Sequence, residues 1–129
     1  MAATAGSSTA PKILSPFPVV RLAGRILAKG VRVTRLTIAA PKGSSISIAC
    51  KGIKRSCPRA MTKRKSTRTR VPVRVRLYER TMRSGTVLRI YVTKAGFVGK
   101  YTRFVIRSRR APRRSDSCAS KVGARVACR

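Results

Sequence analysis

The sequence predicts an all-β domain, built either as a sandwich or as a barrel. About six short runs alternate apolar and polar residues with a period of two, which is typical of strands that bury one face. Turn signals separate these runs at residues 28–30, 41–44, 83–85 and 94–99. Helical spacing is not sustained over any long segment, and 129 residues are enough for one hydrophobic core but not for two.

The first two predicted strands lie in VVRLAGRIL (residues 19–27) and VRVTRLTIAA (residues 31–40). Arg21 and Arg25 take the outward face of the first strand. In the second strand the alternation changes parity midway, and a bulge near Thr34 would bring both halves to one face. The inward positions are Val20, Leu22 and Ile26 in the first strand and Val31, Val33, Leu36 and Ile38 in the second.

Four later segments continue the alternation. The cleanest is residues 71–78, where two arginines and Tyr78 point outward. A single helical turn in YERTMRSG is the one competing signal. Residues 86–93 and 100–107 are joined by a Gly-containing loop and predict an antiparallel hairpin that contributes to the core. The inward positions of the four segments are Ile46, Ile48 and Cys50; Val71, Val73, Val75 and Leu77; Leu88, Ile90 and Val92; and Phe104 and Ile106.

Three regions follow from these patterns. Residues 1–14 are a predicted flexible leader without an apolar core of signal-peptide length, so an exported protein would need a signal that this chain lacks. Residues 15–109 form the sandwich domain, and residues 110–129 a basic, loop-like tail closed by Cys118 and Cys128. No segment approaches the ~20 apolar residues that a membrane-spanning helix needs.

Charge is the unusual feature of the composition. The chain has 32 Lys and Arg residues against two acids, a formal net charge of +30. The preference for Arg over Lys is typical of a high-GC genome, but such a bias does not remove acidic residues. A chain of this charge repels itself when it compacts, and it binds polyanions such as nucleic acid, anionic lipid or acidic wall polymers.

The missing residue types exclude most catalytic chemistry. The chain has no His, and its two acids, Glu79 and Asp116, lie far apart in the sequence among Arg neighbours. Hydrolytic triads need a positioned base, and two-carboxylate mechanisms need a close acid pair. We therefore expect no enzymatic activity, no cofactor, no bound metal and no small-molecule substrate.

The four cysteines have the spacings C-x6-C (Cys50 and Cys57) and C-x9-C (Cys118 and Cys128). Zinc knuckles need C-x2–4-C pairs that aim both thiolates at one point. An even cysteine count in a small basic domain favours two disulfides, and short loops favour the local pairing of the three possible ones. Each small ring would stabilise the fold by roughly 2.5–3 kcal/mol. Free thiols and a zinc site remain the alternatives.

The segment KRKSTRTRVPVR (residues 63–74) is the densest basic run. It could follow a phosphate backbone, or it could be a solvated arm whose charges prevent strand edges from associating. No aromatic residue interrupts it to stack on bases. An RNA-recognition octamer is also absent, because Tyr101 and Phe104 are three residues apart and take opposite faces. The candidate polyanion-binding residues are Lys63, Arg64, Lys65, Arg68, Arg70, Arg74 and Arg76.

Three segments together resemble a known kind of module. They are SPFPVVRLAGRIL, ISIACKG followed by SCP, and GTVLRIYVTKAGFVGKYTRFVIRSRRAPRRSDSC, which span most of residues 15–128. Their order and phrasing resemble an immunoglobulin-like module of exported proteins in high-GC Gram-positive bacteria. The resemblance implies an immunoglobulin-like antiparallel β-sandwich, a non-catalytic envelope or surface role, and structural disulfides at the four cysteines.

Two hypotheses for function follow. The first is an exported, non-enzymatic structural or adhesion module, extracellular or in the cell envelope, that contacts anionic polymers of the cell wall or membrane surface. The alternative is a cytoplasmic nucleic-acid-binding protein, associated with the ribosome or the nucleoid, which the pI of about 12.0 and the basic run favour. The state of the cysteines distinguishes the two, because disulfides persist in oxidising compartments.

Overall fold

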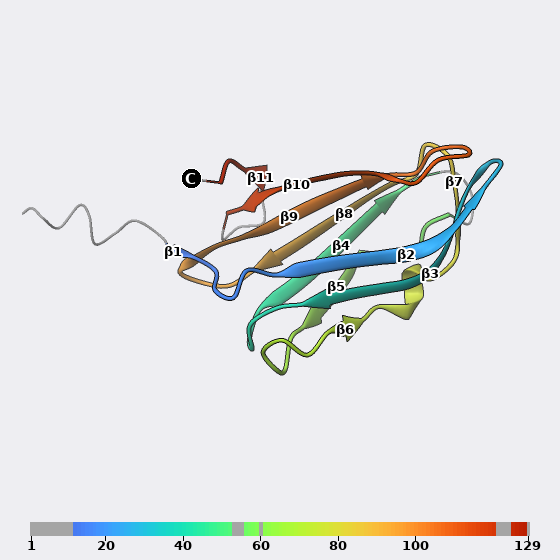
Figure 1. The fold of residues 1–129 in the computed structure, drawn as a ribbon. Coiled ribbons are helices and arrows are strands. Elements are labelled where there is room, and N and C mark those ends of the chain that lie inside the picture. The colour runs from blue at the N-terminus through green and yellow to red at the C-terminus, as the bar shows by residue number, and fades with distance from the viewer. Residues whose placement is uncertain (1–11, 53–55, 60, 121–124, 129) are drawn as a thin grey trace, which may run out of the picture.

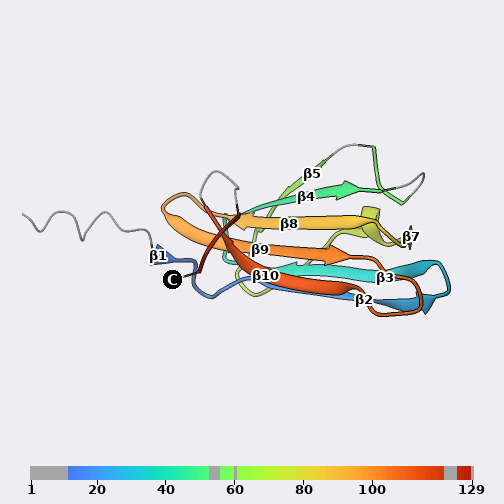
Figure 2. The same ribbon diagram turned by 90° about the horizontal axis from the view of Figure 1, so that it is seen from above.

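Two β-sheets pack face to face in the computed structural model, which describes residues 12–52, 56–59, 61–120 and 125–128 (Figures 1 and 2). The predicted all-β sandwich is therefore confirmed. The larger sheet has the order β11-β10-β9-β8-β4-β5, and β1 adds to β9. Its strands are β1 (Lys12–Ile13), β4 (Ser45–Lys51), β5 (Thr62–Lys65), β8 (Val87–Thr93), β9 (Phe97–Val105), β10 (Arg113–Ala119) and β11 (Arg125–Val126).

The smaller sheet has the order β2-β3-β6, with β7 also pairing with β3. Its strands are β2 (Val19–Leu27), β3 (Gly30–Ala39), β6 (Val73–Arg74) and β7 (Thr81–Arg83), and a 3₁₀ helix η1 (Arg76–Tyr78) separates β6 from β7. The chain changes sheet between β1 and β2, between β3 and β4, between β5 and β6, and between β7 and β8. This alternation, with β4, β8 and β9 side by side, gives the sandwich its immunoglobulin-like arrangement.

The core lies between the sheets, where the inward residues predicted for most strands meet. The bulge expected near Thr34 is confirmed, because Ala23 pairs with Arg35 and Gly24 with Val33. The unpaired Thr34 donates its hydroxyl to the carbonyl of Ala23 over 3.2 Å. Both halves of β3 thereby bury their apolar side chains. The core includes Val20, Val31, Val33, Leu36, Ile38, Ile46, Ile48, Leu88, Ile90, Val92, Phe104 and Ile106.

The prediction for residues 71–78 is wrong beyond its centre. Only Val73–Arg74 forms a strand, and the chain then turns through η1. This turn reverses the two last side chains, so Tyr78 is fully buried while Leu77 is 50% exposed. Val71 is also exposed, and so is Ile26 in β2, although both were expected to point inward. The backbone turns because β6 and β7 pair with opposite ends of β3, and η1 joins them.

The two ends of the chain are more ordered than expected. Residues 113–119 form β10, paired along its length with β9, in place of the predicted loop-like tail. At the other end, Lys12 and Ile13 pair in parallel with β9, and Leu14 is buried. The remainder of the predicted leader, residues 1–11, lies outside the described residues.

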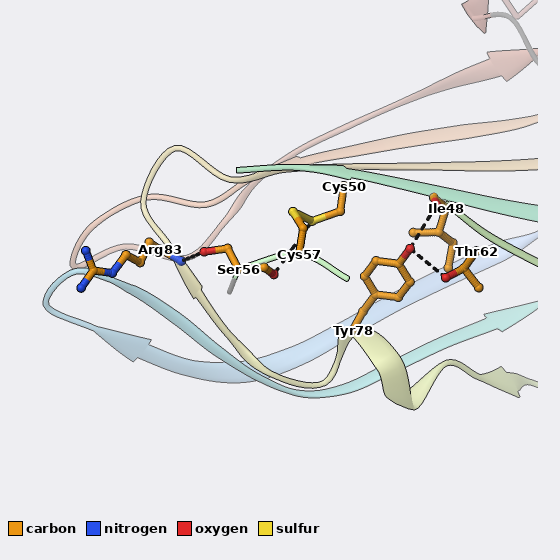
Figure 3. The surroundings of a disulfide bond; sticks show 7 residues. All are labelled: Ile48, Cys50, Ser56, Cys57, Thr62, Tyr78 and Arg83. Atoms are coloured by element: carbon orange, nitrogen blue, oxygen red, sulfur yellow. Dashed lines mark hydrogen bonds between the residues drawn. A yellow bond between two sulfur atoms is a disulfide. The ribbon is translucent and has the colours of Figure 1, made fainter. Parts of the chain in front are cut away.

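Both cysteine pairs form local disulfides, Cys50–Cys57 and Cys118–Cys128, as the short loops favoured. All four cysteines are thus used, which excludes the free-thiol and zinc alternatives for them. Around the first disulfide, the hydroxyl of the buried Ser56 accepts a hydrogen bond from the backbone N–H of Arg83 over 3.0 Å (Figure 3). The disulfide therefore holds the segment after β4 against β7.

Tyr78 links the two layers next to this disulfide. Its hydroxyl donates to the carbonyl of Ile48 over 3.1 Å and lies 2.9 Å from Thr62 Oγ1 (Figure 3). Tyr78 belongs to η1 beside the smaller sheet, whereas Ile48 and Thr62 belong to neighbouring strands of the larger one. A buried tyrosine with its hydroxyl satisfied in this way stabilises the packing of the two sheets.

Candidate anion-binding surfaces

The two acidic side chains are both held by basic residues of the framework. Glu79, directly after η1, accepts two parallel hydrogen bonds from Arg74, each 2.8 Å long. It also accepts the backbone N–H of Leu36 over 3.2 Å. The hydrogen bonds from the Arg74 guanidinium hold the pKa of Glu79 below its usual range, against the opposite effect of burial.

Asp116 organises a cluster on the inward side of β10. Thr102 donates to its Oδ1 over 2.7 Å, Arg114 to its Oδ2 over 2.8 Å, and Lys100 Nζ lies 3.7 Å from Oδ1. Partial burial acts to raise the pKa of Asp116. The hydrogen bonds from Arg114 and Thr102, together with the charges of Arg114 and Lys100, outweigh burial, and the pKa lies below its usual range.

Arg114 and Lys100 also connect the larger sheet to the start of β2 in the smaller sheet. Arg114 donates to the carbonyl of Val20 over 2.8 Å, and Lys100 donates to the carbonyl of Pro18 over 3.0 Å. These contacts cover part of the backbone of β2, the edge strand of the smaller sheet. Burial lowers the pKa of Lys100 below its usual range, and the nearby negative charge of Asp116 offsets part of this decrease. Asp116 and Glu79 therefore have structural roles.

The outer face of the larger sheet presents basic residues that neither acid reaches. In the register of β4, β8, β9 and β10, one row across the strands contains Ala49, Arg89, Arg103 and Ser115. The next row contains Lys63, Ser47, Tyr91, Tyr101 and Ser117. Arg89 and Arg103 are thus direct cross-strand neighbours, and within the described ranges no carboxylate side chain pairs with them. We call Lys63, Lys65, Arg89 and Arg103 the outer basic face.

Two tyrosines stand beside these arginines. The rings of Tyr91 and Tyr101 are 5.0 Å apart and tilted by 46°. Tyr101 is only 5% exposed, so the pair offers no open two-ring platform for unstacked bases. Sequence reasoning missed this pair, because its members lie on different strands and only the register brings them together.

The structure separates the seven predicted polyanion-binding residues. Lys63, Arg64 and Lys65 lie together on β5 and line a shallow hollow of about 260 Å³ with Ser45 and Ser47. The other four lie toward the smaller sheet: Arg68 and Arg70 in the following loop, Arg74 in its ion pair with Glu79, and Arg76 in η1. The predicted site is therefore not one surface.

The loop after β5 is anchored to the turn between β3 and β4. Ser66 exchanges backbone hydrogen bonds with that turn, receiving the N–H of Gly43 over 2.8 Å and donating to Ser44 over 3.0 Å. Its hydroxyl donates to the carbonyl of Ala40 over 3.1 Å, and Thr69 Oγ1 accepts the N–H of Lys42 over 3.1 Å. The segment expected as a cationic arm is a strand followed by a pinned loop, which fixes where its basic residues point.

A hollow on the outer face of the smaller sheet was also missed. It has a volume of about 550 Å³ and includes three arginines that no acidic side chain pairs with in the described part of the chain. Its lining residues come from the segment before β2, from β2, from β3 and the residue that follows it, and from the loop before β6. The sequence signal for it was the outward alternation of Arg21 and Arg35, which the charge of the whole chain obscured.

These observations define the class of the protein as a small, strongly basic, disulfide-linked β-sandwich. Comparisons with protein-family models, with curated proteins and with solved structures found no match to the chain. In the described ranges, no three His, Cys, Asp or Glu side chains group as metal ligands. None of the helices described there has the length and apolar character to cross a bilayer.

Proposed function

We propose that this protein is a non-enzymatic structural or adhesion module that binds anionic polymers of the cell envelope through its outer basic face. The observation that carries the proposal is the pair of arginines at opposed positions on β8 and β9. Like charges directly opposite on a sheet are unfavourable unless an anion lies between them. A linear polyanion crossing the strands would supply that anion and reach Lys63 and Lys65 on β5.

Its two disulfides support a place of action outside a reducing cytoplasm. All four cysteines are paired in Cys50–Cys57 and Cys118–Cys128, and such bonds persist in oxidising compartments. We propose that the protein is exported to the cell envelope or beyond, as its resemblance to exported immunoglobulin-like modules implied. The cytoplasmic nucleic-acid-binding alternative has less support, since disulfides are rare there and the tyrosine pair is closed.

The experiment uses inorganic polyphosphate as the linear anionic probe and compares two double variants of equal charge. Arg89→Gln/Arg103→Gln changes the outer basic face, and Arg25→Gln/Arg32→Gln, an opposed arginine pair on the smaller sheet, is the matched control. We expect the first pair to weaken polyphosphate binding about tenfold or more, and the control to weaken it about twofold, because contact with phosphates is lost only in the first. Binding is measured by titration calorimetry at several salt concentrations.

Two results would contradict the proposal. Equal weakening by both double variants would show that only the total charge matters. Binding of a DNA duplex that is tighter than that of polyphosphate at ~0.15 M salt would favour the nucleic-acid alternative. Cysteine alkylation of protein purified from its own host, without reductant, tests the compartment, and four alkylated thiols would contradict export.

A further inference from the structure

The hollow on the outer face of the smaller sheet combines an apolar floor with a basic rim. Phe17 and Val19 are 39% and 43% exposed there, although both are large apolar side chains. Thr37, by contrast, is only 8% exposed, so its side chain belongs to the floor. The lining also includes two prolines, Pro16 and Pro72, and three arginines, Arg21, Arg35 and Arg70. Its volume of about 550 Å³ is within the usual range of small-ligand sites.

The register of β2 and β3 places two of the arginines close together. Arg21 pairs with Thr37, and Arg35 pairs with Ala23, so Arg21 and Arg35 are diagonal neighbours on one face. A second hollow of about 440 Å³ is also lined by Arg21, Arg35 and Thr37. Both arginines therefore line two recesses on the same face of the sheet.

A third arginine is brought to the rim by an unusual backbone conformation. Arg70 has a φ of 65°, in the left-handed region that side chains other than Gly rarely adopt. The hydrogen bonds of Ser66 and Thr69 to the turn before β4 hold the loop that carries it. Such strain persists only where the surrounding structure maintains it, and it occurs preferentially at functional sites.

On the same face of the smaller sheet, one arginine, Arg74, already binds a carboxylate, that of Glu79. Arg74 pairs with Thr37 on the side opposite Arg21, and it binds the carboxylate of Glu79 through two parallel hydrogen bonds. Glu79 is thereby used, and the lining of the hollow contains no acid. The remaining arginines lack the partner that Arg74 has, which makes an external carboxylate the complementary group.

We propose that this hollow on the smaller sheet binds an amphiphilic carboxylate, that is, an acyl chain with an acidic head. Arg21 and Arg35 hold the head, with Arg70 at the rim, and the chain lies on Phe17, Val19 and the two prolines. Burial of the chain removes exposed apolar surface from water, and the guanidiniums select a charged head over a neutral one. This site is separate from the outer basic face and does not depend on its function.

The test uses octanoate as the probe. Acetate, which has the carboxylate but no long chain, and 1-octanol, which has the chain but no charge, are the comparison ligands. We expect octanoate to bind at least about tenfold more tightly than either comparison ligand, because each lacks one of the two complementary features. Arg21→Gln/Arg35→Gln should weaken octanoate binding about tenfold or more, whereas Arg89→Gln/Arg103→Gln should change it less than about twofold. Val19→Ser leaves the charge unchanged and should also weaken binding. Amide NMR shifts should concentrate at Val19, Thr37 and Ala39.

Several outcomes would overturn the proposal. They are an equal effect of the two double variants, equal affinity for acetate and octanoate, or binding to phosphatidylglycerol vesicles with no binding of octanoate. If the double variant does not fold, Arg21→Gln alone and Val19→Ser apply the same criterion. Polyphosphate binding measured on the same samples separates this result from the function of the outer basic face.

Discussion

Arg74 and Glu79 face each other across η1 and form a two-pronged ion pair, with both N–O distances at 2.8 Å. The carboxylate also accepts the N–H of Leu36 on β3, so one side chain connects β3, β6 and the turn that follows. The chain has a net charge of +30 and only two acids, and the carboxylate of Glu79 is used to connect framework elements.

Replacement of Glu79 by Gln should lower the thermal midpoint by a few degrees. The amide can still accept a hydrogen bond from the N–H of Leu36, but it cannot form the charged pair with Arg74, whose guanidinium then has no carboxylate partner within the described residues. Arg76→Gln is the control, because it removes an exposed charge that forms no ion pair within the described residues, and it should leave the midpoint unchanged or raise it. Near-ultraviolet circular dichroism of the tyrosines follows the transition. An unchanged midpoint for Glu79→Gln would contradict the structural role.

The stability of the protein should be constant from about pH 5 to 7 and fall below about pH 4. The pKa values of Glu79 and Asp116 are both below their usual range in the folded protein. The stability that they contribute is therefore complete above their unfolded pKa values of about 4, and it is lost as the pH falls through the lower folded values. The chain has no His to titrate near neutrality. Urea midpoints between pH 2 and 7 measure the change, and Glu79→Gln/Asp116→Asn should nearly abolish it.

Much of the fold could be predicted because burial imposes a period of two on each strand. The alternation found the core of β3, β4, β8 and β9, and the change of parity located the bulge at Thr34. The prediction failed around Leu77 and Tyr78, where sequence alternation continued but the backbone turned into η1. Alternation specifies faces only while a strand continues, and the end of β6 is set by its pairing with β3.

The candidate sites depended on relationships that no single segment contains. The outer basic face is formed by the register of four strands. The hollow on the smaller sheet forms because the segment before β2 lies beside the loop before β6. Composition alone correctly indicated an excess of cations. It could not distinguish Arg74, which is paired with Glu79, from Arg70, which is not paired with either acid. Composition therefore does not indicate which basic residues are engaged by the framework and which are left for a ligand.

Removal of the first disulfide by Cys50→Ala/Cys57→Ala should lower the free energy of unfolding by about 2.5 kcal/mol. The estimate is the loop-closure entropy of a ring of this size in the unfolded chain. Ser56→Ala, with the disulfide intact, should cost about 1 kcal/mol, because it removes the buried hydroxyl that accepts a hydrogen bond from the N–H of the exposed residue Arg83. Urea denaturation gives both values. A loss of less than about 1 kcal/mol in the cysteine variant would show that the disulfide contributes little to the stability of the fold.

Tyr78→Phe should destabilise the protein by about 1–3 kcal/mol, because the carbonyl of Ile48 would be left buried without its donor. Tyr91→Phe is the matched control, since Tyr91 lies on the outer face of the larger sheet and its hydroxyl can bond to water. It should change the free energy of unfolding by less than about 0.5 kcal/mol. The difference between the two variants, measured in urea, isolates the link between the layers. Equal effects would mean that the Tyr78 hydroxyl contributes nothing specific.

Added salt should stabilise this protein, although salt weakens the ion pairs of most proteins. Only three ion pairs are formed within the described ranges, whereas the net charge is +30, so screening relieves more repulsion than it removes attraction. The thermal midpoint should rise between 10 and about 300 mM sodium chloride. Sodium sulfate at equal ionic strength tests for anion binding, because screening alone predicts the same rise. A larger rise in sulfate that disappears in Arg89→Gln/Arg103→Gln would place bound anions on the outer basic face, and a falling midpoint would contradict the dominance of self-repulsion.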